Sequence, residues 1–283
     1  MQPASPPDGA VVLRIEAVSL AGADRARLSK VPPVITAGFW VAKILGTGMG
    51  EATSDWLHID VSSLVVGAAI GVVAFIIAMA LQFATRSYIS WIYWFAVSIV
   101  AVVGTMGADG MHLILGIPYW ATSSFWVIVL AILFFVWYRT EHTLSIHSIT
   151  NPRREVFYWL TVIATFDLGT AVGDMTAVTF HLGYLASGIL FTAAICIPLV
   201  AWRFFRMNSV FAFWFAYILT RPLGASFADW LAWPHANGGL NLGHGPVAVV
   251  GAILLLLCVV YLTIREQFPR SRAAEDVLEA AQK

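Results

Sequence analysis

The sequence predicts an all-α membrane protein, a polytopic bundle of eight transmembrane helices arranged as four parallel two-helix repeats. Of its 283 residues, 59% are hydrophobic and 11% are charged, and the mean hydropathy is +0.80. A soluble domain carries about 25% charged residues, so this composition is typical of a membrane protein. A motif of tryptophan, glycine and aspartate also recurs four times along the chain at fixed spacing.

The motif places a glycine ten residues and an aspartate fifteen residues after a tryptophan, each time in an apolar stretch. The four sets are Trp40/Gly50/Asp55, Trp94/Gly104/Asp109, Trp159/Gly169/Asp174 and Trp214/Gly224/Asp229. A carboxylate inside a membrane-length helix is costly. Four of them in one register therefore indicate an internal repeat.

Eight segments reach the ~20 mostly apolar residues that a helix needs to cross a bilayer. We place them at 34–57, 61–85, 89–112, 119–138, 155–178, 183–202, 209–232 and 244–264. They form a membrane domain at 34–265, with repeats near 34–88, 89–140, 155–207 and 208–265. Residues 1–33 are expected to be a cytoplasmic segment whose stretch at 11–20 could be a strand or an interfacial helix, and residues 266–283 a cytoplasmic tail.

The basic residues outside the spans all lie on one side of this topology. The loops on the side of the N-terminus contain the arginines and lysines, including Arg86, Arg139 and Arg203, and the loops on the other side contain none. Cytoplasmic loops carry the excess of Lys and Arg, so both termini are predicted to be cytoplasmic.

The two helices of each repeat differ in charge. The second helices have no charged residue in their apolar interiors, whereas the first helices carry all the charge within the spans. These residues are Lys43, Glu51, Asp55, Asp109, Asp167, Asp174, Arg221 and Asp229. Because intramembrane charges face a bundle interior or a wet cavity, we expect four charged helices around a centre and four apolar helices outside them. An even number of helices per unit makes the repeats parallel.

The repeated segments also carry a resemblance to a known family. FWVAKILGTGMGEATSDWL, YWFAVSIVAVVGTMGADGMH, YWLTVIATFDLGTAVGDMTA and FWFAYILTRPLGASFADWLA resemble bacterial multi-pass membrane proteins built from tandem two-helix repeats of unknown function, each marked by a tryptophan. The resemblance covers nearly all of 34–265. It implies a protein of the bacterial inner membrane and brings no activity with it.

One helix face gathers candidate metal ligands. Successive helical residues are about 100° apart, so positions 8, 11, 15 and 18 after the tryptophan share a face. These positions hold carboxylates and two Asp-x-x-His pairs, and we predict metal ligation by Glu51, Asp55, Asp109, His112, Asp174 and Asp229. Carboxylate and imidazole groups stacked on one face can form the first shell of a divalent cation.

The rise of the helix places this face in the membrane. Fifteen residues carry the aspartate about 22 Å from the tryptophan. If the tryptophans are interfacial anchors on the cytoplasmic side, the aspartates lie in the outer half of the bilayer. There the negative ends of four helix dipoles add to their attraction for cations.

Nearer the middle of the spans, Lys43, Asp167 and Arg221 are candidates for a gate or proton relay. An Arg221–Asp167 ion pair is geometrically reasonable and would be either a structural lock or part of a transport pathway. Pro222 removes a helix hydrogen bond, and three nearby glycines loosen the first helix, which predicts broken or kinked helices at mid-membrane.

The leading functional hypothesis is a membrane transporter or channel-like protein for a cation, a divalent metal coupled to protons. The alternatives are an integral membrane enzyme or redox protein using the same polar cavity, and a structural or sensory subunit. The repeat glycines can be packing contacts, and the repeat aspartates can be structural acceptors for a tryptophan N–H or the backbone of a neighbouring repeat. The expected partners are the lipid bilayer and a small cation. No basic cluster indicates nucleic acid, and no cofactor other than a divalent metal ion is indicated.

Overall fold

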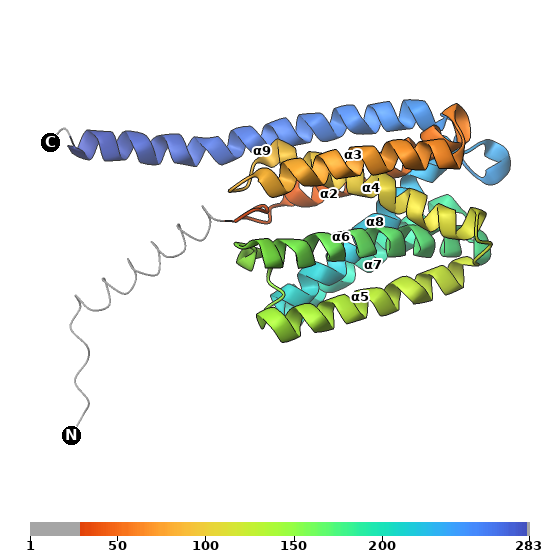
Figure 1. Ribbon diagram of the computed structural model, residues 1–283, viewed down its shortest axis with the longest axis horizontal. Coiled ribbons are helices and arrows are strands. Elements are labelled where there is room, and N and C mark those ends of the chain that lie inside the picture. Colours follow the sequence, from red (N-terminus) through yellow and green to blue (C-terminus); the bar gives the residue numbers. More distant parts are fainter. Residues whose placement is uncertain (1–28, 282–283) are drawn as a thin grey trace, which may run out of the picture.

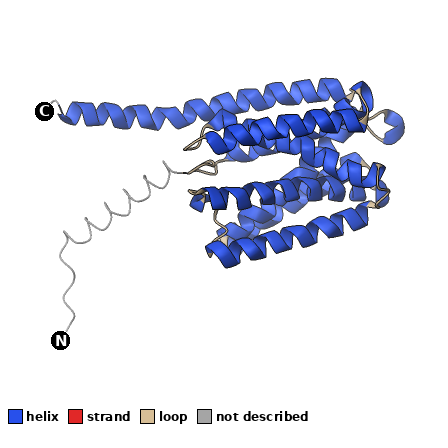
Figure 2. Cartoon of the chain, viewed as in Figure 1, coloured by secondary structure: helices blue, strands red, loops and turns tan. Residues whose placement is uncertain are grey.

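The described residues, 29–281 of the computed structural model, form helices and loops without strands (Figure 2), which confirms the all-α prediction. The long helices are α2 (Ala37–Asp55), α3 (Leu64–Ala84), α4 (Ser90–Leu113), α5 (Tyr119–Glu141), α6 (Pro152–Asp174), α7 (Tyr184–Phe205), α8 (Ser209–Ala232) and α9 (His244–Ala281). The π-helical segments η1 (Trp56–Val61) and η3 (Met175–Thr179) continue α2 and α6. Two short 3-10 turns, η2 (Ile146–Ser148) and η4 (His235–Asn237), lie in loops.

Seven of the described helices are long and apolar enough to cross a membrane. The eighth, α2, is not among them, and it carries Lys43, Glu51 and Asp55. The fold is therefore that of a helical membrane bundle. Helix α9 continues through most of the expected tail and extends past the other helices (Figure 1), while the stretch at 11–20 lies outside the described residues.

Polar residues just before the helices explain several of the starting points. The side chains of Thr36, Ser63, Asn151 and Asn208 accept hydrogen bonds from backbone N–H groups in the first turns of α2, α3, α6 and α8. Such caps satisfy donors that the helix leaves free at its N-terminus. Pro152 follows Asn151 and suits the first helical position.

The first helices of the repeats form a closed inner ring. Helix α2 packs on α4, α4 on α6, α6 on α8, and α8 back on α2. In the most apolar windows of α4, α6 and α8, 67%, 72% and 56% of residues are buried, against 22–28% in the other four membrane-length helices. The charged helices thus lie inside and the apolar ones outside, as the charge distribution predicts.

The outer helices interlock the repeats. Helix α3 packs mainly on α4, α5 on α6, α7 on α8, and α9 on α2. Each outer helix therefore covers the inner helix of the next repeat, and α9 closes the set on the first repeat.

The repeat glycines are the points where neighbouring inner helices touch. A Cβ on Gly104 would lie 2.7 Å from the Cβ of Phe166, seven residues after the next tryptophan. The same pairing recurs around the ring as Gly50 with Ala101, Gly169 with Arg221, and Gly224 with Thr47. The interpretation of these glycines as packing contacts is confirmed, because a side chain at any of them would overlap the adjacent helix.

The tryptophans close one end of the ring with an aromatic layer. The aromatic residue before each tryptophan packs on the tryptophan of the next repeat: Phe39 on Trp94, Tyr93 on Trp159, Tyr158 on Trp214 and Phe213 on Trp40, with centroids 5.5, 5.8, 6.1 and 5.6 Å apart. We call this end of the bundle the tryptophan end and the opposite end the aspartate end. The prediction of interfacial anchors is wrong for Trp94, Trp159 and Trp214, because these side chains are buried inside the bundle.

The inner helices are not broken in their middle. Helix α2 runs through Gly46, Gly48 and Gly50, and α8 runs through Pro222, each as one α-helix. The departures from α-helical geometry in these inner helices lie instead at the aspartate end, in η1 and η3. Gly48 and Gly50 pack tightly against α8 and α4, and these contacts support the backbone of α2 where its glycines would otherwise weaken it.

Candidate functional site

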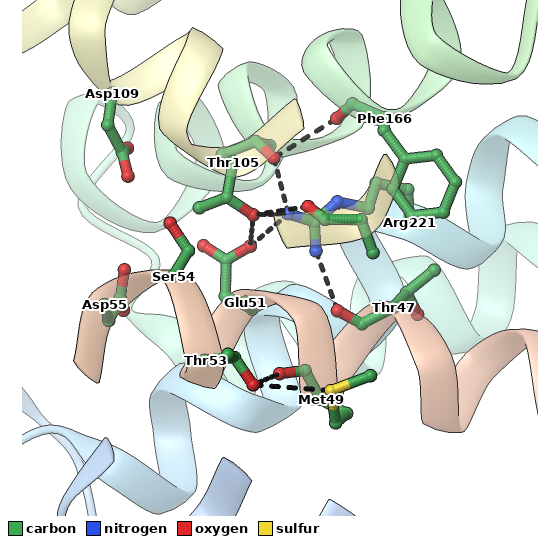
Figure 3. Close-up of polar contacts among 12 residues, drawn as sticks. Thr47, Met49, Glu51, Thr53, Ser54, Asp55, Thr105, Asp109, Phe166 and Arg221 are labelled. Carbon is green, nitrogen blue, oxygen red and sulfur yellow. Dashed lines mark hydrogen bonds and ion pairs between the residues drawn. The ribbon is translucent and has the colours of Figure 1, made fainter. Parts of the chain in front are cut away.

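Arg221, on α8, lies at the centre of the ring and binds the other three inner helices (Figure 3). Its Nη2 donates to the carboxylate of Glu51 and to the hydroxyls of Thr105 and Thr170, the last at 2.7 Å. Its Nη1 donates to the carbonyl oxygen of Thr47 at 2.9 Å. Arg221 is only 1% exposed, so these partners replace water at its two terminal nitrogens, while its Nε has no hydrogen-bond partner among the described residues.

The sequence register explains this convergence. Glu51, Thr105 and Thr170 all stand eleven residues after their repeat tryptophan, and Arg221 stands seven after its own. The Thr105 hydroxyl also donates to Glu51 at 3.0 Å. The fourth repeat has Ala225 at the equivalent position. This position is therefore polar in three repeats and apolar in the fourth, which supplies Arg221.

The predicted Arg221–Asp167 ion pair is wrong, because Arg221 pairs with Glu51 instead. Asp167 is buried against α4, where its Oδ1 occupies the space that a side chain on Gly107 would need. Position 8 lies about 60° around the helix from position 11, which turns Asp167 away from the axis that Arg221 and Glu51 share.

Lys43 lies between Arg221 and the aromatic layer. Its Nζ is 3.8 Å from the ring centroid of Phe166 and 4.0 Å from that of Tyr217, and it has no hydrogen-bond partner. Cation–π attraction to two rings is the interaction that holds this buried ammonium group. Lys43, Asp167 and Arg221 thus lie in the interior, and the structure connects only Arg221 to the acidic residues through hydrogen bonds.

The carboxylates gather at the aspartate end. Glu51, Asp174 and Asp229 form one group whose ligand atoms all lie within 4.8 Å of one another, and Asp55, His58 and Asp109 form a second. Glu51, Asp55, Asp109 and Asp229 are between 3% and 9% exposed. Five of the six predicted ligands are therefore brought together from all four inner helices, and we call these five residues the acidic cluster.

The four aspartates of the acidic cluster lack the partners that a structural role would supply. Among residues 29–265, whose side chains the structure describes, no donor forms a hydrogen bond to any of these four carboxylates. The N–H groups of the repeat tryptophans lie at the other end of the bundle, where Trp214 Nε1 donates to the carbonyl oxygen of Leu144 at 2.9 Å. The interpretation of the repeat aspartates as acceptors for tryptophan N–H groups is wrong, because fifteen helical residues separate the two layers.

His112 is the predicted ligand that the structure leaves outside both groups. Its ring stacks on Tyr119 with centroids 3.9 Å apart, and its Nδ1 lies 3.0 Å from the Ile117 carbonyl oxygen. His58, the equivalent residue of the first repeat, occupies the ligand position that was predicted for His112. The shared Asp-x-x-His register was the signal for His58, whereas His244 on α9 reaches the same region only because α9 packs on α2.

Two apolar grooves lie elsewhere, near the tryptophan end. The larger, about 740 Å³, is lined by parts of α2, α7 and α8, including Trp40, Trp202 and Phe213, and the smaller, about 570 Å³, by parts of α5 and α8. Neither contains a residue of the acidic cluster. Their lining suits lipid chains or apolar contacts and offers few groups for binding an ion.

The interlocked helix pairs and the recurring residues define a membrane protein made of tandem repeats. The family model described as "Repeat of Unknown Function (DUF347)" matches the chain four times, at residues 38–88, 92–143, 157–208 and 212–268. The chain belongs to this family, which confirms the resemblance seen in the repeated segments. Comparison with curated proteins and with solved structures gave no match.

Proposed function

We propose that this chain is a membrane transporter of a divalent cation, coupled to protons, and that the acidic cluster at the aspartate end is its ion-binding site. The observation that carries the proposal is the convergence of five carboxylates from four inner helices. Arg221, the cation among them, is already paired with Glu51. Four further aspartates at short range repel one another when ionised, so they need a cation or protons from outside the chain.

The topology completes the proposal. All eight long helices cross the membrane, including α2, whose charged residues are covered by the ring and by α9. The distribution of Lys and Arg places the tryptophan end and both termini on the cytoplasmic side of a bacterial inner membrane. The acidic cluster then lies in the outer half of the bilayer.

The layers suggest how access changes during transport. Arg221 with its partners, Lys43 between two rings, and the aromatic layer fill the axis from the acidic cluster to the tryptophan end. An ion reaching the cluster from outside cannot pass until these layers separate. Parallel repeats that rock against one another provide such an alternation.

Transport is tested in liposomes that contain the purified chain and a metal-sensitive dye. We expect uptake of a divalent ion such as Mn²⁺ or Zn²⁺ by the wild type, and loss of uptake for Asp109→Asn, which removes a charge without changing shape. Glu141→Gln is the matched control, because Glu141 lies at the tryptophan end and pairs with Arg153 and Arg154.

Three results would count against this proposal. Equal flux through wild type and Asp109→Asn would remove the acidic cluster from the pathway. Unchanged flux together with a lower midpoint of unfolding would indicate a structural or sensory subunit. A bound chromophore in the absorption spectrum of the purified chain would favour a membrane enzyme or redox protein.

A further inference from the structure

Two histidines at the aspartate end face carboxylates at a distance that a hydrogen bond does not explain. His58 Nε2 lies 3.8 Å from Asp109 Oδ2, and His244 Nε2 lies 3.8 Å from Asp55 Oδ2. Hydrogen bonds from nitrogen to oxygen span 2.7–3.2 Å. In both pairs the two atoms approach each other without bonding.

The other nitrogen of each ring is held by a fixed acceptor. His58 Nδ1 lies 2.7 Å from the carbonyl oxygen of Ser54, and His244 Nδ1 lies 3.2 Å from a carboxylate oxygen of Asp60. Because these partners only accept, each Nδ1 carries the proton and donates it. Each Nε2 then presents its lone pair toward an aspartate, as metal-binding histidines do when a second residue orients them.

Buried polar atoms without partners lie in the same place. His244 is 6% exposed, and its Nε2 has no hydrogen-bond partner. The Ser54 hydroxyl is fully buried, also lacks a partner, and lies among Glu51, Asp55 and Asp109 (Figure 3). Orphaned polar atoms are costly, so their accumulation around carboxylates indicates that something else occupies the space between them.

The distances suit ligands of one ion. Nitrogen and oxygen ligands bind a transition metal at about 2.0–2.2 Å, so two ligands of one ion can be up to about 4.2 Å apart. The 3.8 Å between His58 Nε2 and Asp109 Oδ2 lies within this limit. Asp55 belongs to the same group and also faces His244, so it links the two histidines.

We propose that Asp55, His58 and Asp109 bind a divalent transition-metal ion, with His244 adjacent on the far side of Asp55 and with Ser54 and Asp60 orienting the two imidazoles. An imidazole ligand favours transition metals, whereas Mg²⁺ and Ca²⁺ prefer oxygen alone. The neighbouring group of Glu51, Asp174 and Asp229 offers only oxygen and receives the ion next. This step toward the deeper group rests on the proposed function, whereas binding at the histidine group does not.

Binding is tested on the purified full chain in detergent with Co²⁺, whose visible spectrum reports its ligands. We expect Co²⁺ to bind and an equal concentration of Mg²⁺ to leave it in place. His58→Gln should weaken Co²⁺ binding about 10-fold or more because it removes the imidazole ligand, and Asp60→Asn, which alters only the orientation of the adjacent His244, should weaken it less. His235→Gln is the matched control, because His235 Nδ1 has a similar partner, the Gly239 carbonyl oxygen at 2.8 Å, and no carboxylate faces its ring within residues 29–281.

A second measurement avoids variants that fail to fold. Pulsed EPR of Cu²⁺ bound to the wild-type chain should show coupling to imidazole nitrogen. Absence of that coupling would overturn the proposal, as would wild-type Co²⁺ affinity in His58→Gln or displacement of Co²⁺ by equal Mg²⁺.

The outcomes also separate the inference from the proposed function. Histidine-dependent Co²⁺ binding without flux in liposomes would leave the site in place and reject the transporter. Metal flux that His58→Gln does not alter would support the transporter and reject His58 as a ligand.

Discussion

Replacing Gly50 with alanine puts a methyl group into the contact between α2 and α4. That methyl would overlap the Cβ of Ala101 and would lie 3.0 Å from its carbonyl carbon, so relief requires movement of the α4 backbone. Gly46, one turn earlier in the same helix, is the matched control. A methyl there would meet only Leu255 Cδ2 at 3.7 Å, which is ordinary contact.

The helix-propensity gain is common to both variants and cancels in their comparison. Alanine in place of glycine in a helix interior stabilises by about 0.5–1 kcal/mol. Forcing an extra methyl into a packed contact costs about 1–3 kcal/mol. We therefore expect Gly46→Ala to unfold at or above the wild-type midpoint and Gly50→Ala to be less stable than Gly46→Ala by about 1–3 kcal/mol.

The assay is reversible unfolding of the purified chain in mixed micelles, followed by tryptophan fluorescence and circular dichroism. Free energies of unfolding that agree within about 0.5 kcal/mol would refute the reasoning, since additive errors between independent sites are of that size. Such agreement would mean that α2 and α4 do not approach at Gly50.

Two further predictions concern the buried cations. Arg221→Met should lower the free energy of unfolding by about 3–5 kcal/mol, because Glu51 loses its partner. The double variant Arg221→Met/Glu51→Leu should regain most of that loss. Equal stability of the single and double variants would contradict the pairing. Lys43→Met should keep or raise stability in the same assay, because the ammonium group has no hydrogen bond to lose, and it should change ion flux if Lys43 gates the axis. A loss for Lys43→Met as large as that for Arg221→Met would show that Lys43 has polar partners after all.

The periodic features of the chain were predictable because every repeat records them. Spacing of the motif predicted the helices, their division into inner and outer sets, and the meeting of Asp55, Asp109, Asp174 and Asp229. Because each motif position occurs four times, an unusual residue in one repeat does not hide the pattern. A residue that stands on the inner face in each repeat must face the axis when the repeats close into a ring.

Features that depend on which repeat meets which were not predictable in this way. The choice of Glu51 over Asp167 as the partner of Arg221 depends on the closure of the ring, which brings α2 as well as α6 against α8, and on Asp167 turning toward α4. His244 reaches Asp55 because α9 covers the first repeat and not its own. The tryptophans were misplaced because an interfacial residue and a buried one look alike in sequence, although the aromatic residue before each of them hinted at a packed layer.

The closing of the ring on its first helix has a consequence for biosynthesis. Thr47 on α2 donates to the carbonyl oxygen of Thr220 on α8, and 173 residues separate them. At about 5–20 residues per second, α8 emerges from the ribosome about 10–35 s after α2. Throughout that interval α2 lacks the α8 partners of its buried charges, Tyr217 beside Lys43 and Arg221 beside Glu51. In newly made chains, α2 therefore stays incompletely packed until α8 and α9 have been synthesised. Substitutions that weaken α9 should first affect the insertion of α2 in the membrane, because α9 packs on α2.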